Sequence, residues 1–150
     1  MTTVLDYLSA EHRQCDEAFA IAEEAAHTSD LAGCRTHFQQ FQAAMERHFQ
    51  KEEQVLFPTF EEATGNAMGP TRVMRLEHQQ MRGTLAGMAS ALADGDLESY
   101  LGDGETLLIL MQQHNIKEEQ MLYPMSDRFL ASVADQVIAA LQEFQPEQPV

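Results

Sequence analysis

An eleven-residue segment occurs twice in this chain, 66 residues apart. The first copy begins at His48 and reads HFQKEEQVLFP, and the second begins at His114 and reads HNIKEEQMLYP. The same offset relates Glu11-His12 to Glu77-His78. A repeat of this kind predicts two similar halves in the folded chain, and each half carries the pattern His…His-x-x-x-Glu.

Apolar residues recur at spacings of three and four through most of the chain, which is the pattern of an amphipathic helix. Four such stripes are present, and the repeated histidines and glutamates lie on them. The stripes comprise Leu5, Leu8, His12, Cys15, Phe19, Ala22 and Ala26; Cys34, Phe38, Phe41, Met45, His48, Glu52 and Val55; Met74, His78, Met81, Leu85, Met88 and Leu92; and Leu107, Met111, His114, Glu118 and Met121.

Turn-forming residues separate the stripes at residues 28–30, 64–70 and 94–96. Pro58 and Pro124 are expected to kink or end their helices. The sequence therefore predicts an all-α fold, an antiparallel up-down-up-down four-helix bundle with a short C-terminal helix. We expect a single domain over 1–150, with the bundle at about 3–125, the last helix at about 130–144 and a tail at 145–150.

The spacing of the histidines predicts that they meet. In an antiparallel hairpin, two residues equidistant from the turn lie level. His12 and His48 have their midpoint in the first turn, and His78 and His114 have theirs in the third, so each pair lies roughly 27 Å from its turn. The midpoint of His48 and His78 falls at the edge of the second turn, so all four imidazoles are expected at one level.

The same measure separates the two cysteines. Cys34 is eleven residues from the position on its helix that is level with Cys15, or roughly 16 Å of helical rise. A disulfide needs Cα atoms within about 7 Å. We therefore expect no bond between them, and Cys15 is predicted to be a core residue one turn from the histidines.

Histidine and glutamate four residues apart lie on one face of a helix, so both can reach the same point inside the bundle. Two ionised carboxylates facing each other in a dry core are costly unless they are paired or bind metal. We therefore predict that two cations lie there, both bridged by the glutamates, with two histidines from one half on each. The predicted ligands are His12, His48, Glu52, His78, His114 and Glu118.

Mixed imidazole and carboxylate ligation suits iron, manganese or zinc. The alternative is a duplicated bundle without metal, in which the histidines are hydrogen-bonded core residues. Other polar residues near the ligands are expected to have structural positions. Glu53 and Glu119 should face solvent or a neighbouring helix, and the lysines Lys51 and Lys117 and the unrepeated histidines His27 and His37 should lie at the surface. Tyr7 and Tyr123 are candidate redox neighbours of the centre.

Charge and hydropathy exclude several classes of partner. The formal charge of −15 disfavours nucleic acid and anionic membranes, which need a basic surface. No apolar run approaches the ~18 residues of a membrane span. The first residues lack the basic and apolar regions of a secretory signal, so a cytoplasmic location is expected.

The ligand pattern resembles the hemerythrin-like HHE cation-binding family over roughly residues 5 to 125. The segment from His48 to Pro58, with Ala67-Met68-Gly69-Pro70 and Glu77-His78, is most similar to the di-iron domain of repair-of-iron-centres proteins. The resemblance implies a four-helix bundle that holds a non-haem di-iron centre bridged by an oxo or hydroxo group and two glutamates.

Two departures qualify the resemblance. Oxygen-carrying hemerythrins place a histidine where this chain has Met74, which puts simple oxygen carriage in doubt. The repair proteins have a small cysteine-containing domain before the bundle, and we expect it to be absent here because only eleven residues precede His12.

The leading hypothesis from the sequence is a soluble di-iron protein that reacts with O2, peroxide or NO in stress response or iron-centre repair. A reversible O2 or NO carrier or sensor is the second hypothesis. The third is a di-iron catalase-like or oxidase enzyme, and the fourth is a structural bundle that binds zinc adventitiously.

Overall fold

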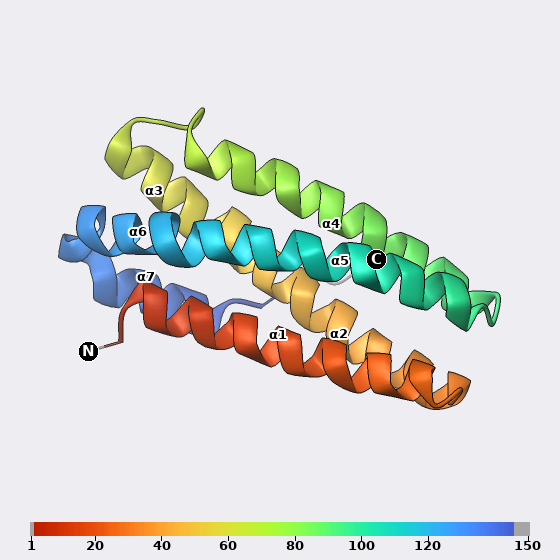
Figure 1. The fold of residues 1–150 in the computed structure, drawn as a ribbon. Coiled ribbons are helices and arrows are strands. Elements are labelled where there is room, and N and C mark those ends of the chain that lie inside the picture. The colour runs from red at the N-terminus through yellow and green to blue at the C-terminus, as the bar shows by residue number, and fades with distance from the viewer. Residues whose placement is uncertain (1, 146–150) are drawn as a thin grey trace.

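Four long antiparallel helices form the body of the protein, which a computed structural model describes for residues 2–145 (Figure 1). They are α1 (Val4–His27); α2 (Leu31–Lys51) continuing into α3 (Phe57–Thr64); α4 (Pro70–Ala93); and α5 (Leu97–Lys117) continuing into α6 (Tyr123–Phe129). A short 3-10 turn (Ala131–Val133) leads into α7 (Ala134–Glu143). No strand occurs among residues 2–145, and the predicted all-α class is confirmed.

The two hairpins begin and turn in the same way. Asp30 caps α2 by accepting a hydrogen bond from Gly33 N–H, and its repeat equivalent Asp96 caps α5 by accepting one from Ser99 N–H. The turn residues Ser29 and Gly95 have φ values of 60° and 72°. Both turns therefore contain one residue in the left-handed conformation, which glycine adopts without strain and serine does not. Figure 1 shows both turns at the same end of the bundle.

A π-helical turn joins α2 to α3, and a second one joins α5 to α6. They span Glu52–Leu56 and Glu118–Leu122. In each, a backbone N–H donates five residues back, from Phe57 to Glu52 O and from Tyr123 to Glu118 O. The prolines follow at once. A proline ring would clash with the carbonyl four residues before it in an α-helix, and the wider turn avoids this.

Of the two outcomes expected at Pro58 and Pro124, a kink or an end, the end of the helix is wrong, because the π-turns carry both helical segments past the prolines. Each π-turn adds one residue to the helical turn, so the buried positions after it lie one residue later in the sequence than an α-helix would place them. Val55 is only half-buried and Met121 is 56% exposed, although both were expected in the core. Leu56 with Phe57, and Leu122 with Tyr123, are buried instead.

The core consists of two apolar clusters with the histidines between them. One cluster extends from Cys15 to the hairpin turns and includes Phe41 and Met88. The other fills the opposite end, with Leu8, Met74 and residues of α7. His12 lies between Leu8 and Cys15 on α1 and thus marks the boundary. Both cysteines are buried and free, as expected.

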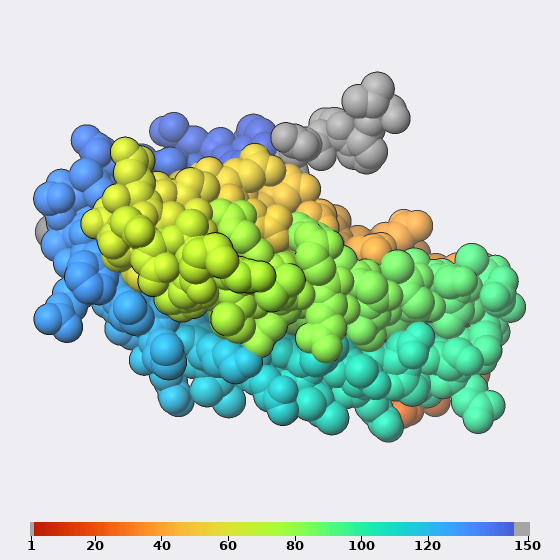
Figure 2. All heavy atoms as spheres, turned by 90° about the horizontal axis from the view of Figure 1, so that it is seen from above, coloured from red at the N-terminus to blue at the C-terminus, as the bar shows by residue number. Residues whose placement is uncertain are grey.

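The last helix covers one end of the bundle. Val137, Ile138 and Leu141 of α7 are buried in the second cluster, and Figure 2 shows this helix lying along the surface beside the α2–α3 segment. At the same end, the Asp127 carboxylate accepts hydrogen bonds from the N–H groups of Val4 and Leu5, which ties α6 to the start of α1. The described helices include none that is long and apolar enough to cross a membrane.

Candidate metal centre

The structure brings the six predicted ligands together in the interior. They come from four helices, and the side chains are at most 4% exposed. The glutamates are the first residues of the two π-turns. Two groups have one donor atom per residue within 4.8 Å of one another: Glu52, His78, His114 and Glu118 form one, and His12, His48 and Glu118 form the other.

Each buried carboxylate lies between imidazoles of both halves. Glu118 Oε1 is 3.1 Å from Nε2 of His12 and 3.1 Å from Nε2 of His114. Glu52 Oε1 is 3.1 Å from Nε2 of His78 and 3.3 Å from Nε2 of His48. Glu118 has a donor atom in both groups and could therefore bridge two cations, and Glu52 lies close to imidazoles of both halves.

A second set of four glutamates holds the outer nitrogen of each histidine. The Nδ1 atoms of His12, His48, His78 and His114 lie 2.8, 2.9, 2.6 and 2.8 Å from carboxylate oxygens of Glu119, Glu11, Glu53 and Glu77, respectively. An Nδ1–H that donates to a carboxylate leaves Nε2 to face the centre and raises its basicity as a ligand. All four imidazoles are thus oriented for metal binding.

Only part of this arrangement was predicted from the sequence. Glu53 and Glu119 do face neighbouring helices, one of the two expected positions, but their bonds to His78 and His12 were not predicted. The equivalent role of Glu11 and Glu77 was missed, although the 66-residue repeat contains both pairs. Repetition of an acid beside a candidate ligand was the available signal.

The lysines support these outer carboxylates. Lys51 Nζ lies 2.6 Å from Glu11 Oε2 and 2.9 Å from the Tyr7 hydroxyl, and Lys117 pairs with Glu77. The surface position expected for Lys51 is wrong, because its side chain crosses to α1 and is only 6% exposed. Tyr7 therefore contacts this lysine and not the central carboxylates.

Nearby carboxylates raise the pKa values of three of the four imidazoles. Burial alone would lower the pKa of His114, but the charge of Glu118 and its hydrogen bond raise it to about 10. The pKa values of His48 and His78 are also raised against the effect of burial, mainly by Glu52. A hydrogen bond from His114 lowers the pKa of Glu77 to about 2, despite partial burial. The site therefore favours positive charge.

Two buried polar atoms test whether a metal fits. Among residues 2–145, Glu118 Oε2 has no hydrogen-bond partner, and His114 Nε2 has none with good geometry, although it lies 3.1 Å from the charged Oε1 of Glu118. Buried polar groups are rarely left in this state, and each one costs about 1–3 kcal/mol. A cation between the imidazole and carboxylate would satisfy both. The donor types and the unpaired atoms thus fit a metal.

The surroundings of the two halves differ. Arg82 donates to both oxygens of Glu53, at 2.8 and 3.0 Å. Its repeat equivalent is Asp16, whose pKa is raised by burial and by the charge of Glu119. A surface hollow opens here and is lined by Asp16, Gln112, Asn115, Ile116, Glu119 and Gln120. Solvent thus approaches the outer side of His12, while the Arg82 ion pairs cover His78.

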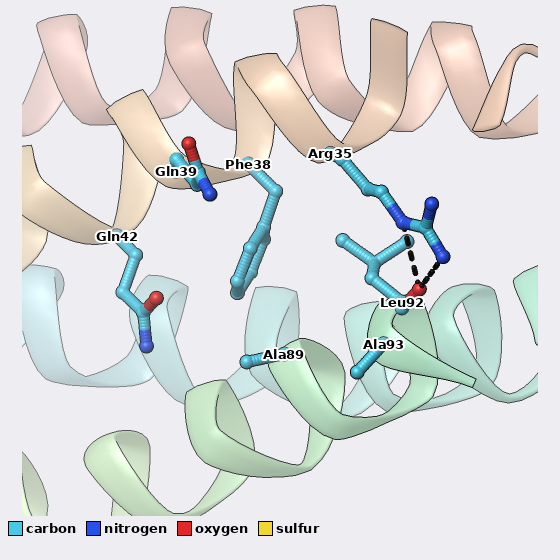
Figure 3. Close-up of a pocket in the computed structure, with 7 residues that line it drawn as sticks. All are labelled: Arg35, Phe38, Gln39, Gln42, Ala89, Leu92 and Ala93. Carbon is cyan, nitrogen blue, oxygen red and sulfur yellow. Dashed lines mark hydrogen bonds between the residues drawn. The ribbon is translucent and has the colours of Figure 1, made fainter. Parts of the chain in front are cut away.

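A separate hollow between α2 and α4 does not belong to the centre (Figure 3). Phe38 and Ala89 form part of its wall, and Arg35 at one end donates two hydrogen bonds to Leu92 O. Arg35 is thirteen residues before His48, roughly 20 Å along the helix. The unrepeated histidines are also apart from the centre: His27 is exposed and His37 half-buried.

Comparison with known families agrees with this geometry. The model of the hemerythrin HHE cation binding domain matches residues 3–126. The chain belongs to this family. Searches of curated proteins and of solved structures gave no match. As a hemerythrin-like protein, the chain has a buried histidine and glutamate cluster that can bind metal, and its particular similarity to the repair-of-iron-centres proteins stays a prediction.

Proposed function

We propose that this hemerythrin-like protein holds two iron ions and reacts with small oxidants. The observation that supports the proposal is the pairing of four imidazoles, each held through Nδ1 by a carboxylate, around two buried glutamates. Iron accepts this ligand set, and manganese and zinc are possible substitutes. When bound, an iron pair would supply electrons to, or accept them from, a small molecule.

The burial of the centre limits the size of the reactant. The predicted ligands are at most 4% exposed, so a reactant must pass between side chains. O2, NO and hydrogen peroxide are small enough to do so, whereas an organic substrate would need a cleft that reaches the histidines. We propose that the protein serves in oxidative or nitrosative stress, or in repair of iron centres.

The residues around the centre have defined parts in this function. The outer glutamates hold the imidazoles in one orientation, and the lysines hold Glu11 and Glu77 in turn. Apolar clusters on both sides exclude bulk water. Reversible gas carriage and a catalase-like activity would use the same residues, so the fate of the reactant distinguishes them.

Metal content tests the first part of the proposal. We expect two irons per chain in protein purified from iron-supplemented cells, with an optical spectrum that changes on reduction. His48→Ala combined with His114→Ala should abolish binding, whereas His27→Ala combined with His37→Ala removes two histidines outside the centre and should preserve it. Full metal occupancy in the first double variant, or redox-silent zinc alone, would refute the di-iron proposal.

Reactivity tests the second part. The reduced protein should be oxidised by hydrogen peroxide or O2, or take up NO, within seconds in stopped-flow absorption. Release of unchanged O2 on lowering its pressure would indicate a carrier, and sustained peroxide turnover without iron loss would indicate an enzyme. No spectral response to any of the three reactants would contradict reaction with small oxidants.

A further inference from the structure

Tyr123 breaks the symmetry of the centre. Its repeat equivalent is Phe57, and each residue follows a π-turn that begins with a buried glutamate. Five residues on an α-helix would turn Tyr123 away from the face of Glu118, but the π-turn returns it there. One half of the centre thus contains a hydroxyl that the other half lacks.

The Tyr123 hydroxyl lies among the predicted ligands. Its oxygen is 2.7 Å from Glu52 Oε2, 2.9 Å from Glu118 Oε1 and 3.1 Å from His12 Nε2, and the side chain is fully buried. A phenol has one proton to donate. It can therefore donate to only one of these three neighbours at a time.

The spacing of these atoms matches that of adjacent ligands on a single ion. First-row metals bind nitrogen and oxygen donors at roughly 2.0–2.2 Å, which puts neighbouring donors at right angles about 3 Å apart. The Tyr123 oxygen, His12 Nε2 and Glu118 Oε1 are 2.9–3.1 Å from one another. A cation in contact with the last two would thus lie within reach of the first.

The opposite half offers no equivalent donor. The Phe57 ring stacks on His78 with centroids 5.6 Å apart, and Phe49 stacks on the same imidazole at 4.2 Å. Met74, one turn before His78, is buried in the same apolar cluster as Phe57. A thioether is a poor ligand for a hard cation.

We propose that Tyr123 is a direct ligand of one ion of the pair, the ion held by His12 and His48, and that the other ion has no tyrosine. The inference rests on the proposed di-iron function. Coordination replaces the O–H bond with an oxygen–metal bond and releases one proton to solvent. Tyr123 thereby differs from the outer glutamates, which act through the imidazoles.

The iron-loaded ferric protein provides the test. We expect a visible phenolate-to-iron absorption band, and resonance Raman excitation in it should show tyrosine ring modes that shift when ring-deuterated tyrosine is incorporated. The chain has three tyrosines. Tyr7→Phe and Tyr100→Phe should retain the band, and Tyr123→Phe should lose it while keeping two irons per chain.

Two further results make the test decisive. Combining Phe57→Tyr with Tyr123→Phe moves the hydroxyl to the other half and should restore a band. If the unmodified chain holds two irons without tyrosine ring modes, Tyr123 is only a hydrogen-bond donor, and this inference fails while the di-iron proposal stands. Absence of iron from the unmodified chain would overturn the di-iron proposal. The labelled unmodified chain decides the matter even if Tyr123→Phe does not fold.

Discussion

The two outer glutamates Glu53 and Glu119 occupy equivalent positions in unequal surroundings. Replacing each by glutamine should therefore lower metal affinity in both cases but change the stability of the fold to different extents. Glutamine keeps an oxygen that can accept from His78 or His12 but loses the charge. Outer partners of metal-bound histidines typically contribute 10–100-fold in affinity, or about 1.4–2.7 kcal/mol. We expect both variants to lose metal affinity by this amount.

The stability of the metal-free protein should separate the two variants. Glu53→Gln also weakens two hydrogen bonds from Arg82, which keeps its bonds to Glu46. This should cost about 1–2 kcal/mol of unfolding free energy, or about 2–8 °C in Tm for a chain of this length. Glu119 faces Asp16 instead of an arginine. Loss of its charge relieves a repulsion, and Glu119→Gln should change the unfolding free energy by less than about 0.5 kcal/mol.

Chelator competition measures the affinity, and thermal unfolding of the metal-free protein measures the stability. Glu17→Gln, an exposed substitution on α1, is the control for loss of one negative charge. The reasoning would be refuted if Glu119→Gln bound metal as tightly as this control. Equal destabilisation by the Glu53 and Glu119 variants would show that Arg82 does not distinguish the two halves.

Three further predictions concern pH, capping and the thiols. The pKa of His114 is raised to about 10 in the metal-free fold, so its stabilising contribution is complete below about pH 6.5 and is lost as the pH rises through 10; Tm of the metal-free protein should fall over that range. An unchanged or rising Tm would contradict this. Asp127→Ala removes the acceptor of two N–H groups at the start of α1 and should cost about 1–2 kcal/mol in urea unfolding, whereas the exposed substitution Asp135→Ala should cost less. Cys15 and Cys34 are buried and free, so both should react with a thiol reagent only after unfolding; rapid labelling of the native protein would show that the core opens.

The fold followed from patterns that short-range physics determines. Apolar spacings of three and four predicted the helices. The turns that contain Asp30 and Asp96 could also be located, because a side chain that caps a helix bonds to residues close in sequence. The meeting of the four histidines needed only the helical rise and the antiparallel order. These inferences concern positions along a helix axis, which a sequence records directly.

Rotation about the helix axis was predicted correctly up to the buried glutamates but not beyond them. The π-turns at Glu52 and Glu118 shift the buried face by one residue, which exposes Met121 and buries Tyr123. A proline after an acidic turn predicts a break as readily as a π-turn, because both relieve the same clash. The position of Lys51 likewise depends on a partner on another helix.

The two halves differ at positions close to the centre, and the repeat alone does not predict how these differences affect metal binding. Positions 66 residues apart agree at the predicted ligands and outer glutamates, where both ions need the same donors. They differ at Phe57 and Tyr123, and at Arg82 and Asp16, so the groups around the two proposed ion positions are unlike. If two ions bind at these positions, their unequal neighbours should give them unequal reduction potentials and exchange rates. Stepwise rather than simultaneous loss of iron to a chelator is therefore expected, and the Tyr123→Phe chain should narrow the gap between the two steps; a single step in the unmodified chain would show that these differences do not reach the ions.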